Sequence, residues 1–199
     1  MRYKKSDISV EHIVKAATRV LARQGYARTS LMDIAKEAGM SKGAVHYHFP
    51  TKEALIGVVL RTTCDNVANR TIQAWTAGDN PIESLRSSLR ELWRFRTELS
   101  DDASVVADLM AQSVHDQKLR EPLAEYYRFL TRQVNENIKD TLEKLGLEPK
   151  IPLEVLPRIL NALLDGLLLQ YIVDPGAVPE EQVLDSLETL ASSILQLKE

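Results

Sequence analysis

Residues 41–55, SKGAVHYHFPTKEAL, combine several side chains that could do chemistry, among them two histidines, His46 and His48, and two lysines, Lys42 and Lys52. Two histidines so close together suggest a metal site or an acid–base catalyst. On a helix, however, residues two apart point to different sides, so these two imidazoles do not converge on one ion. The chain contains no Glu-x-x-His motif either. The pattern therefore predicts no metal site, no catalytic site, no cofactor and no enzymatic activity.

The same segment fits a helix–turn–helix that binds DNA. Ser30 can cap a short helix that ends at Gly39, and Ser41 can cap a second one that runs to about Phe49. Glycine readily takes the positive φ that the turn between them needs. The side chains expected to be buried are the apolar ones, namely Ile34, Ala35, Ala38, Met40, Val45 and Phe49.

The exposed face of the second helix then carries small or hydrogen-bonding groups, which suit a major groove. Gly43 lets the backbone come close, and Ala44 can contact a thymine methyl group. Lys42 can reach a guanine edge or a phosphate. The full exposed set is Lys42, Gly43, Ala44, His46 and Tyr47.

Two further side chains near this helix are candidates for the DNA backbone. Thr51 caps the next helix, and Lys52 in its first turn adds a positive charge to the free N–H groups there, which favours a phosphate. His48 has two open interpretations, a phosphate contact or a partly buried structural residue.

The segment TSLMDIAKEAGMSKGAVHYHFPTKEAL resembles the DNA-binding signature of the tetracycline-repressor-like (TetR) regulators, and RQGYARTS before it fits the family's opening. Beyond residue 70 only the helical layout and ALLDGLLLQYIVDP are similar to the family. The resemblance implies base contacts by Lys42, Gly43, Ala44 and His46, and DNA-backbone contacts by Ser30, Tyr47, His48 and Lys52. Where this chain has His46 the family usually has tyrosine, so the operator of a relative should not be assumed.

Charge is unevenly distributed along the chain. Residues 1–61 contain eleven Lys or Arg and five Asp or Glu, a balance of +6, whereas the remainder has a balance of −9. A basic N-terminal part followed by an acidic remainder indicates that only the N-terminal part binds a polyanion, although chance unevenness is the alternative.

The N-terminus has no apolar run typical of a signal peptide, and the single Cys64 fits a reducing compartment. Segment 162–173 is too short to span a bilayer. We expect a cytoplasmic protein without membrane contact.

The elements that position these residues all show helical periodicity. About nine helices and no strand are expected, which predicts an all-α fold. The charge balance changes near the fourth helix, so we expect a DNA-binding domain at 1–60, with the helix–turn–helix at about 30–49, and an effector-binding and dimerisation domain at 61–199.

The resemblance also implies a ligand cavity among the helices of the second domain, and such cavities are mostly apolar with few polar groups. The effector is expected to be apolar or amphipathic. Ten aromatic, apolar or polar residues are its candidate contacts, although each also fits a core or surface role: Trp93, Met110, Gln112, His115, Tyr126, Tyr127, Phe129, Asn161, Asp165 and Gln170.

The last two helices are predicted to form a homodimer interface. The helix around Leu160 to Ile172 is apolar nearly all round and so needs cover on two sides, and the final helix has a heptad-like seam that extends to Leu197. The candidate interface residues are Leu163, Gly166, Leu167, Val183, Leu187, Leu190, Ile194 and Leu197.

These features together predict a ligand-responsive repressor that binds a palindromic operator in double-stranded DNA as a homodimer. Three alternatives stay open: a DNA-binding regulator that needs no effector, an activator of the same fold, and a helical enzyme with a vestigial front. No nucleophile–base pair, phosphate loop or metal-ligand spacing in the sequence favours the enzyme.

Overall fold

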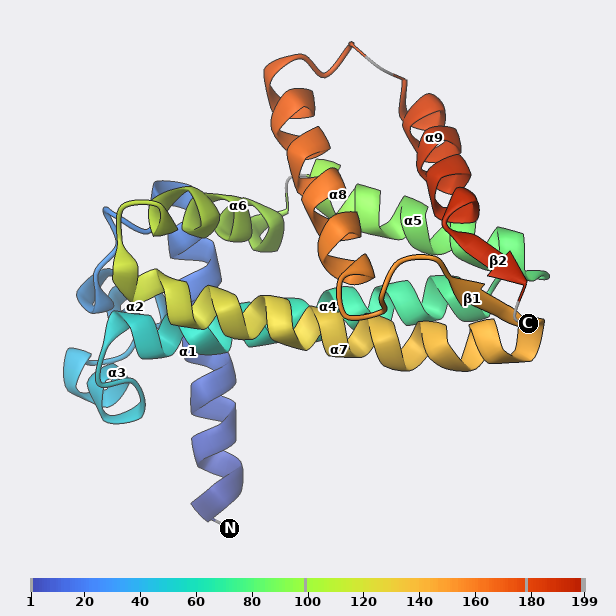
Figure 1. The fold of residues 1–199 in the computed structure, drawn as a ribbon. Coiled ribbons are helices and arrows are strands. Elements are labelled where there is room, and N and C mark those ends of the chain that lie inside the picture. The colour runs from blue at the N-terminus through green and yellow to red at the C-terminus, as the bar shows by residue number, and fades with distance from the viewer. Residues whose placement is uncertain (1, 99, 178, 198–199) are drawn as a thin grey trace. The chain divides into compact units, whose positions relative to one another are not determined.

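The computed structural model describes the backbone of residues 2–98, 100–177 and 179–197 (Figure 1), and the side chains in these ranges except at 2–8, 81–82, 137–138, 140–141, 144–145 and 197. Within these ranges the chain is almost wholly helical, which confirms the all-α prediction. The helices are α1 (Arg2–Gln24), α2 (Leu31–Glu37), α3 (Lys42–His48), α4 (Lys52–Thr76), α5 (Pro81–Thr97), α6 (Asp101–Ser113), the 3-10 helix η1 (Gln117–Leu119), α7 (Arg120–Leu145), α8 (Leu156–Val173) and α9 (Glu180–Ser193).

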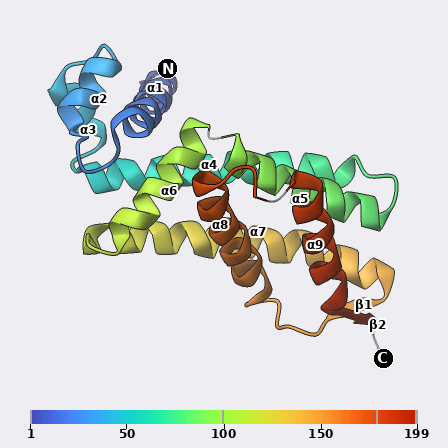
Figure 2. The ribbon, with the colours of Figure 1, turned by 90° about the horizontal axis from the view of Figure 1, so that it is seen from above.

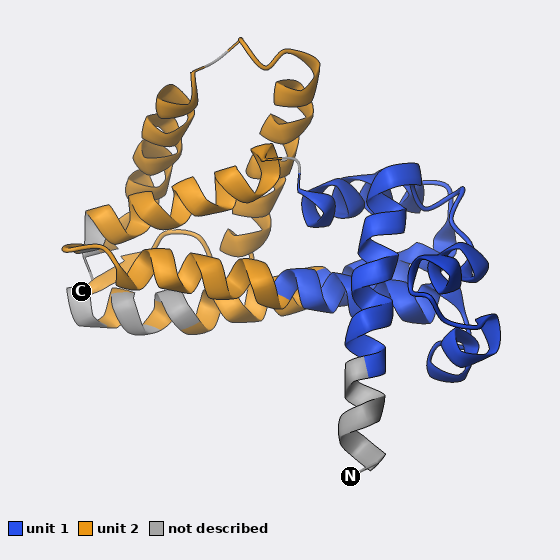
Figure 3. Cartoon of the chain, turned by 180° about the vertical axis from the view of Figure 1, so that it is seen from behind, with its two compact units in different colours: residues 1–64, 99–126 blue, residues 65–98, 127–199 orange. Residues whose placement is uncertain are grey.

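The chain divides into two compact units, each made of two separate stretches (Figure 3). Unit 1 comprises residues 1–64 and 99–126, and unit 2 comprises residues 65–98 and 127–199. The expected functional division into 1–60 and 61–199 concerns what each part binds, and it stays a prediction.

Local hydrogen bonds explain where α2 and α3 of unit 1 begin and end. The hydroxyl of Ser30 accepts the backbone N–H of Asp33, whose carboxylate accepts the N–H of Ser30, so the two residues form a capping box. Ser41 caps α3 by accepting the N–H of Ala44 at 3.2 Å. Gly39 has a φ of 62°, the left-handed conformation that lets α2 stop and the chain turn into α3.

Helix α1 holds this pair in place within unit 1 (Figure 1). The His12 Nε2 atom lies 2.9 Å from the carbonyl oxygen of Ala38, at the end of α2. Arg19 and Arg23 form exposed ion pairs with Glu37, at 3.0 and 3.2 Å. The apolar side of α1 supplies five fully or nearly fully buried residues: Ile13, Ala16, Ala17, Val20 and Leu21.

In unit 2, α8 and α9 both pack on α5 (Figure 2). Their shared core consists of Leu89, Trp93, Leu164, Val183, Leu184 and Leu187. Beside this core Arg86 binds Asp185 and Glu188, each at 2.7 Å, and thereby connects α5 to α9.

Two expectations about the C-terminal part were wrong. The structure has a pair of short antiparallel strands, β1 (Leu147–Pro149) and β2 (Leu195–Leu197), where no strand was expected. Helix α9 therefore ends at Ser193, and Ile194 and Leu197 do not continue a heptad seam on it. Three-residue strands are too short to show alternation, and their pairing depends on a partner 48 residues away in sequence.

Candidate functional site

The exposed face of α3 carries most of the residues predicted to read DNA bases. Lys42, Gly43 and His46 are exposed, and Ala44 is half-buried. Tyr47 is the most accessible of them, with 83 % of its surface exposed. The structure thus brings these five residues together on one short helix.

Burial on the opposite side fixes which face of α3 turns outward. Val45 and Phe49 are buried, as are Ile34, Ala35 and Ala38 from the preceding helix, which confirms those expectations, whereas Met40 is only half-buried. Because Val45 lies in the middle of a seven-residue helix, its burial turns positions 43, 46 and 47 away from the core. Lys42 lies on the same side as Val45 but at the first residue of the helix, where it is exposed.

The candidates for the DNA backbone have additional structural contacts. Ser30 is exposed, but its oxygen already caps α2, and its hydrogen bonds lower the pKa of the Asp33 carboxyl. His48 is half-buried, and its ring lies edge-on to that of Tyr47, with the ring centres 5.2 Å apart.

Lys52 makes internal contacts that the sequence did not predict. Its ammonium donates to the backbone carbonyl oxygens of Tyr26 and Thr29, at 2.9 and 3.0 Å, and lies 3.7 Å from the centre of the Tyr26 ring. This burial lowers the pKa of the Lys52 ammonium. An ammonium has three N–H donors, so two such bonds leave one for a phosphate.

Tyr26 belongs to a polar cluster that sequence reasoning missed. Its hydroxyl lies 3.2 Å from Glu53 Oε1 and 3.3 Å from Asp116 Oδ2, and its backbone N–H donates to Asp108 at 2.6 Å. Burial and the nearby carboxylates raise the pKa of the Tyr26 phenol. The cluster links the turn before α2 to α6 and η1, and no short-range pattern could have indicated it, because Asp108 and Asp116 are 82 and 90 residues away from Tyr26.

The ten candidate ligand contacts are divided between the two units. Met110, Gln112, His115 and Tyr126 lie in unit 1, where His115 is exposed and Tyr126 is buried. The other six lie in unit 2: Trp93, Tyr127, Phe129, Asn161, Asp165 and Gln170. Of these, Gln170 is exposed, and Trp93 packs edge-on against Tyr171 with ring centres 5.8 Å apart.

Three of the unit 2 candidates surround Arg96, a buried residue of α5. Its guanidinium donates to Asp165 at 2.8 Å and to the side-chain oxygen of Asn161 at 2.9 Å, both on α8. The Tyr127 hydroxyl lies 3.5 Å from Asp165, and burial followed by the charge of Asp165 raises the pKa of Tyr127 to about 12. These polar groups therefore satisfy one another, as buried charges require.

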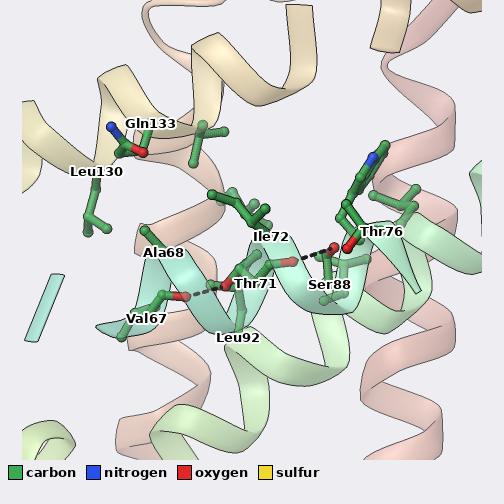
Figure 4. A pocket seen from close by; sticks show the side chains of 14 residues that line it. Val67, Ala68, Thr71, Ile72, Thr76, Ser88, Leu92, Leu130 and Gln133 are labelled. Carbon is green, nitrogen blue, oxygen red and sulfur yellow. Dashed lines mark hydrogen bonds between the residues drawn. The ribbon is translucent and has the colours of Figure 1, made fainter. Parts of the chain in front are cut away.

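Residues described in unit 2 line two apolar cavities, and none of the ten candidates lines either of them. A ligand contact by those residues stays a prediction. The smaller cavity, of about 260 Å³, lies between α4, α5, α7 and α8 (Figure 4). The larger one, of about 620 Å³, extends to α9, β1 and β2. The sequence contained one signal for the first cavity: Val67, Thr71 and Trp75 recur every four residues on α4.

The outer face of α8 carries an apolar stripe. Ile159, Ala162, Gly166, Leu169 and Val173 are spaced three or four residues apart, and Leu169 and Val173 are 62 % and 85 % exposed. Among the predicted interface residues, Leu163 and Leu190 are exposed and Gly166, Leu167 and Ile194 are half-buried. Val183 and Leu187 are instead buried in the core of their own chain, and the side chain of Leu197 lies outside the described residues.

Within the part of the chain that the structure describes, no three His, Cys, Asp or Glu side chains are grouped so that they could hold a metal ion. The features of the site are thus an exposed reading helix in unit 1 and two apolar cavities beside an apolar helix face in unit 2.

Comparison with known proteins assigns both parts of the chain to one group. Residues 13–59 match the family model described as "Bacterial regulatory proteins, tetR family". Residues 81–196 match the model described as "BetI-type transcriptional repressor, C-terminal".

Similar proteins have the same kind of description. The HTH-type transcriptional regulator LmrA of Bacillus subtilis is 28 % identical over 174 residues, which cover 86 % of this chain and 90 % of LmrA. The uncharacterized HTH-type regulator YuxN of the same species is 37 % identical over 93 residues, 47 % of this chain and 32 % of YuxN. A crystal structure of a TetR-family regulator from Rhodococcus sp. has the same fold, with a TM-score of 0.80, 21 % identity, and coverage of 94 % of this chain and 97 % of that one.

Proposed function

The chain belongs to the TetR family of bacterial transcriptional regulators, and from this premise we propose that it is a ligand-responsive repressor that binds a palindromic operator as a homodimer. The observation that carries the proposal is the exposed face of α3 in unit 1, which presents small or hydrogen-bonding groups. The apolar cavities of unit 2 support the response to a ligand. We place its action in the cytoplasm, where the operator is.

DNA recognition in this proposal depends on α3 in the major groove. Lys42, Gly43, Ala44 and His46 face the bases, while Tyr47 reaches the DNA backbone. Ser30, His48 and Lys52 are the other proposed backbone contacts. The positive balance of residues 1–61 supports this assignment, because phosphate neutralisation supplies much of the affinity for DNA.

A two-fold partner is proposed to cover the outer face of α8. By length and composition alone Leu156–Val173 could cross a membrane, with a mean hydropathy of 1.3 and 22 % of the segment buried. In a family of DNA-binding regulators we propose that a second copy, not lipid, covers it. A dimer also presents two α3 helices, which bind half-sites about 34–36 Å apart or a multiple of that distance.

The effector is proposed to act from unit 2. It stabilises a conformation of the dimer in which the two reading helices no longer match adjacent half-sites. It can shift this equilibrium only by its difference in affinity between the two conformations. An apolar cavity lined by four helices supports this role, because a ligand there contacts several elements at once.

The test is a duplex-binding titration with the full-length chain. A binding sequence is first selected from random duplexes, and its affinity is then measured at several salt concentrations, with the mass of the complex determined by sedimentation. We expect two chains on each palindromic site and an affinity that falls steeply with salt. Binding that is absent or does not depend on salt would falsify the proposal.

A further inference from the structure

The wall of the smaller cavity is almost entirely apolar. Among the described residues that line it there is no Asp, Glu, Lys, Arg or His. Its polar side chains are Thr71, Thr76, Ser88, Gln133 and the indole of Trp75. A charged ligand group placed here would lose its hydration without meeting an opposite charge.

The hydroxyl groups in this wall have already used their hydrogens. Thr71 donates to the carbonyl oxygen of Val67 at 2.8 Å, and Ser88 donates to that of Thr71 at 3.4 Å (Figure 4). Thr76 donates to the carbonyl oxygen of Gln73 at 3.0 Å. A hydroxyl has one hydrogen and two lone pairs, so these three groups offer the ligand acceptors and no donor.

The larger cavity continues this environment. It shares Trp75, Leu85, Leu89, Val134 and Leu160 with the smaller one, and its other described lining residues also carry no charge. The two cavities are therefore adjacent, and an extended molecule that occupied both would stay in apolar surroundings. Two of its lining residues, Ile159 and Leu163, are exposed on α8, whose outer face we assign to the partner copy.

We propose that the effector is a neutral, extended, mainly apolar molecule that has one hydrogen-bond donor, with a long-chain alcohol as the simplest example. The smaller cavity takes the donor end, and the larger cavity takes the rest. Carboxylates and ammonium ions of the same length are excluded, because the wall offers neither charge. The inference depends on the proposed function only in treating these cavities as the effector site.

The test compares four probes that share one alkyl chain: decanol, decyl methyl ether, decanoate and decylammonium. Each is titrated into the full-length protein without DNA, at neutral pH, by calorimetry. The two neutral probes stay below their aqueous solubility, and the two ions below their micelle concentration. Tryptophan fluorescence gives a second signal, because the chain has two tryptophans and only Trp75 lines the cavities. The variant Trp75→Phe should lose this signal.

We expect decanol to bind about a hundredfold more tightly than either ion, because an uncompensated buried charge is costly. The ether lacks the donor and should bind about fivefold more weakly than decanol, the effect of one net hydrogen bond. If either ion binds as tightly as decanol, or if no probe binds, the inference is wrong.

Variants test the donor separately. Because Thr76 is exposed, we place the ligand's donor at Thr71 and Ser88. The double variant Thr71→Val and Ser88→Ala removes these two acceptors, so decanol and its ether should then bind equally. Thr131→Val is the matched control, because the Thr131 hydroxyl also donates to a backbone carbonyl of its own helix, at 2.8 Å from Tyr127, and it lines neither cavity. A preference for decanol that survives in the double variant would contradict the donor assignment.

The outcomes for ligand and DNA are independent. If the protein binds its selected duplex but does not prefer the neutral probe, the ligand class is wrong and the regulatory function stands. If it prefers decanol but binds no duplex, the ligand class stands and the proposed function is wrong.

Discussion

His46 gives the reading helix a group that can donate or accept a hydrogen bond and is shorter than the tyrosine usual in the family. Its exposure on α3 supports a base contact. We predict that His46→Tyr changes the preferred base pair at one or more operator positions, by about 1–3 kcal/mol each. Selection from random duplexes by wild type and variant measures this. The control His115→Tyr replaces an exposed histidine between α6 and η1 and should leave the preference unchanged. If the wild-type protein and His46→Tyr select the same base pairs, position 46 reads no base.

Lys52 combines a structural role with a proposed DNA contact, and the two can be separated. Lys52→Ala leaves the carbonyls of Tyr26 and Thr29 without their donor, so we predict a loss of about 1–3 kcal/mol in unfolding free energy, measured by urea denaturation. If Lys52 also binds a phosphate, the salt slope of DNA binding falls by about one.

Lys36→Ala, at an exposed position of α2, is the control for the loss of a positive charge, and its stability should not change. A destabilised Lys52→Ala variant with an unchanged salt slope would mean that Lys52 is only structural.

Arg96 connects α5 to α8 through a charge pair that is largely removed from water. Asp165→Asn leaves the buried guanidinium without its counter-charge, so we predict a destabilisation of about 3–5 kcal/mol by urea denaturation. Replacing both partners, Arg96→Met with Asp165→Leu, should cost less than the single change, because no unpaired charge remains. Glu98→Gln, which removes the charge from the exposed pairs with Arg94 and Arg70, is the control and should change stability far less than Asp165→Asn. Equal effects of the buried and exposed changes would contradict this role.

At the scale of helices and strands, the sequence predicted the ends of an element correctly where neighbouring residues determine them. The caps at Ser30, Ser41 and Thr51 all form as expected, since each involves a backbone N–H three residues away. The end of α9 was not predictable, because the chain leaves that helix to form β2, which pairs with β1 about 48 residues earlier. A periodic run of leucines cannot show that a strand partner competes for its last residues.

Across the whole molecule, the reading face could be predicted and the cavities could not. The exposed residues of α3 follow from one helix and its buried side. The cavity walls combine four helices, and the candidate ligand residues Asn161 and Asp165 instead form a network with Arg96. Polar side chains on an apolar helix indicate that they contact another polar group. The sequence does not show whether that group belongs to a ligand or to an arginine 65 or 69 residues away.

At the level of the dimer, self-association and DNA binding should be lost together. Gly166 lies in the middle of the exposed stripe of α8, and a Cβ added there meets no atom within 4 Å in its own chain. Gly166→Glu should therefore leave the monomer folded, since glutamate also favours a helix more than glycine does. Facing a second copy, however, it places two carboxylates near the two-fold axis in an apolar contact.

We predict that Gly166→Glu sediments as a monomer and binds the palindromic site at least about a hundredfold more weakly, because two half-sites are no longer bound by one particle. Its circular dichroism should stay helical. Gly57→Glu is the matched control: Gly57 lies within α4, where an added Cβ also meets no atom within 4 Å, and this variant should remain a dimer. A dimeric Gly166→Glu variant would show that the outer face of α8 is not the contact between copies, and the partner would then have to be sought on α9, where Leu190 is 51 % exposed.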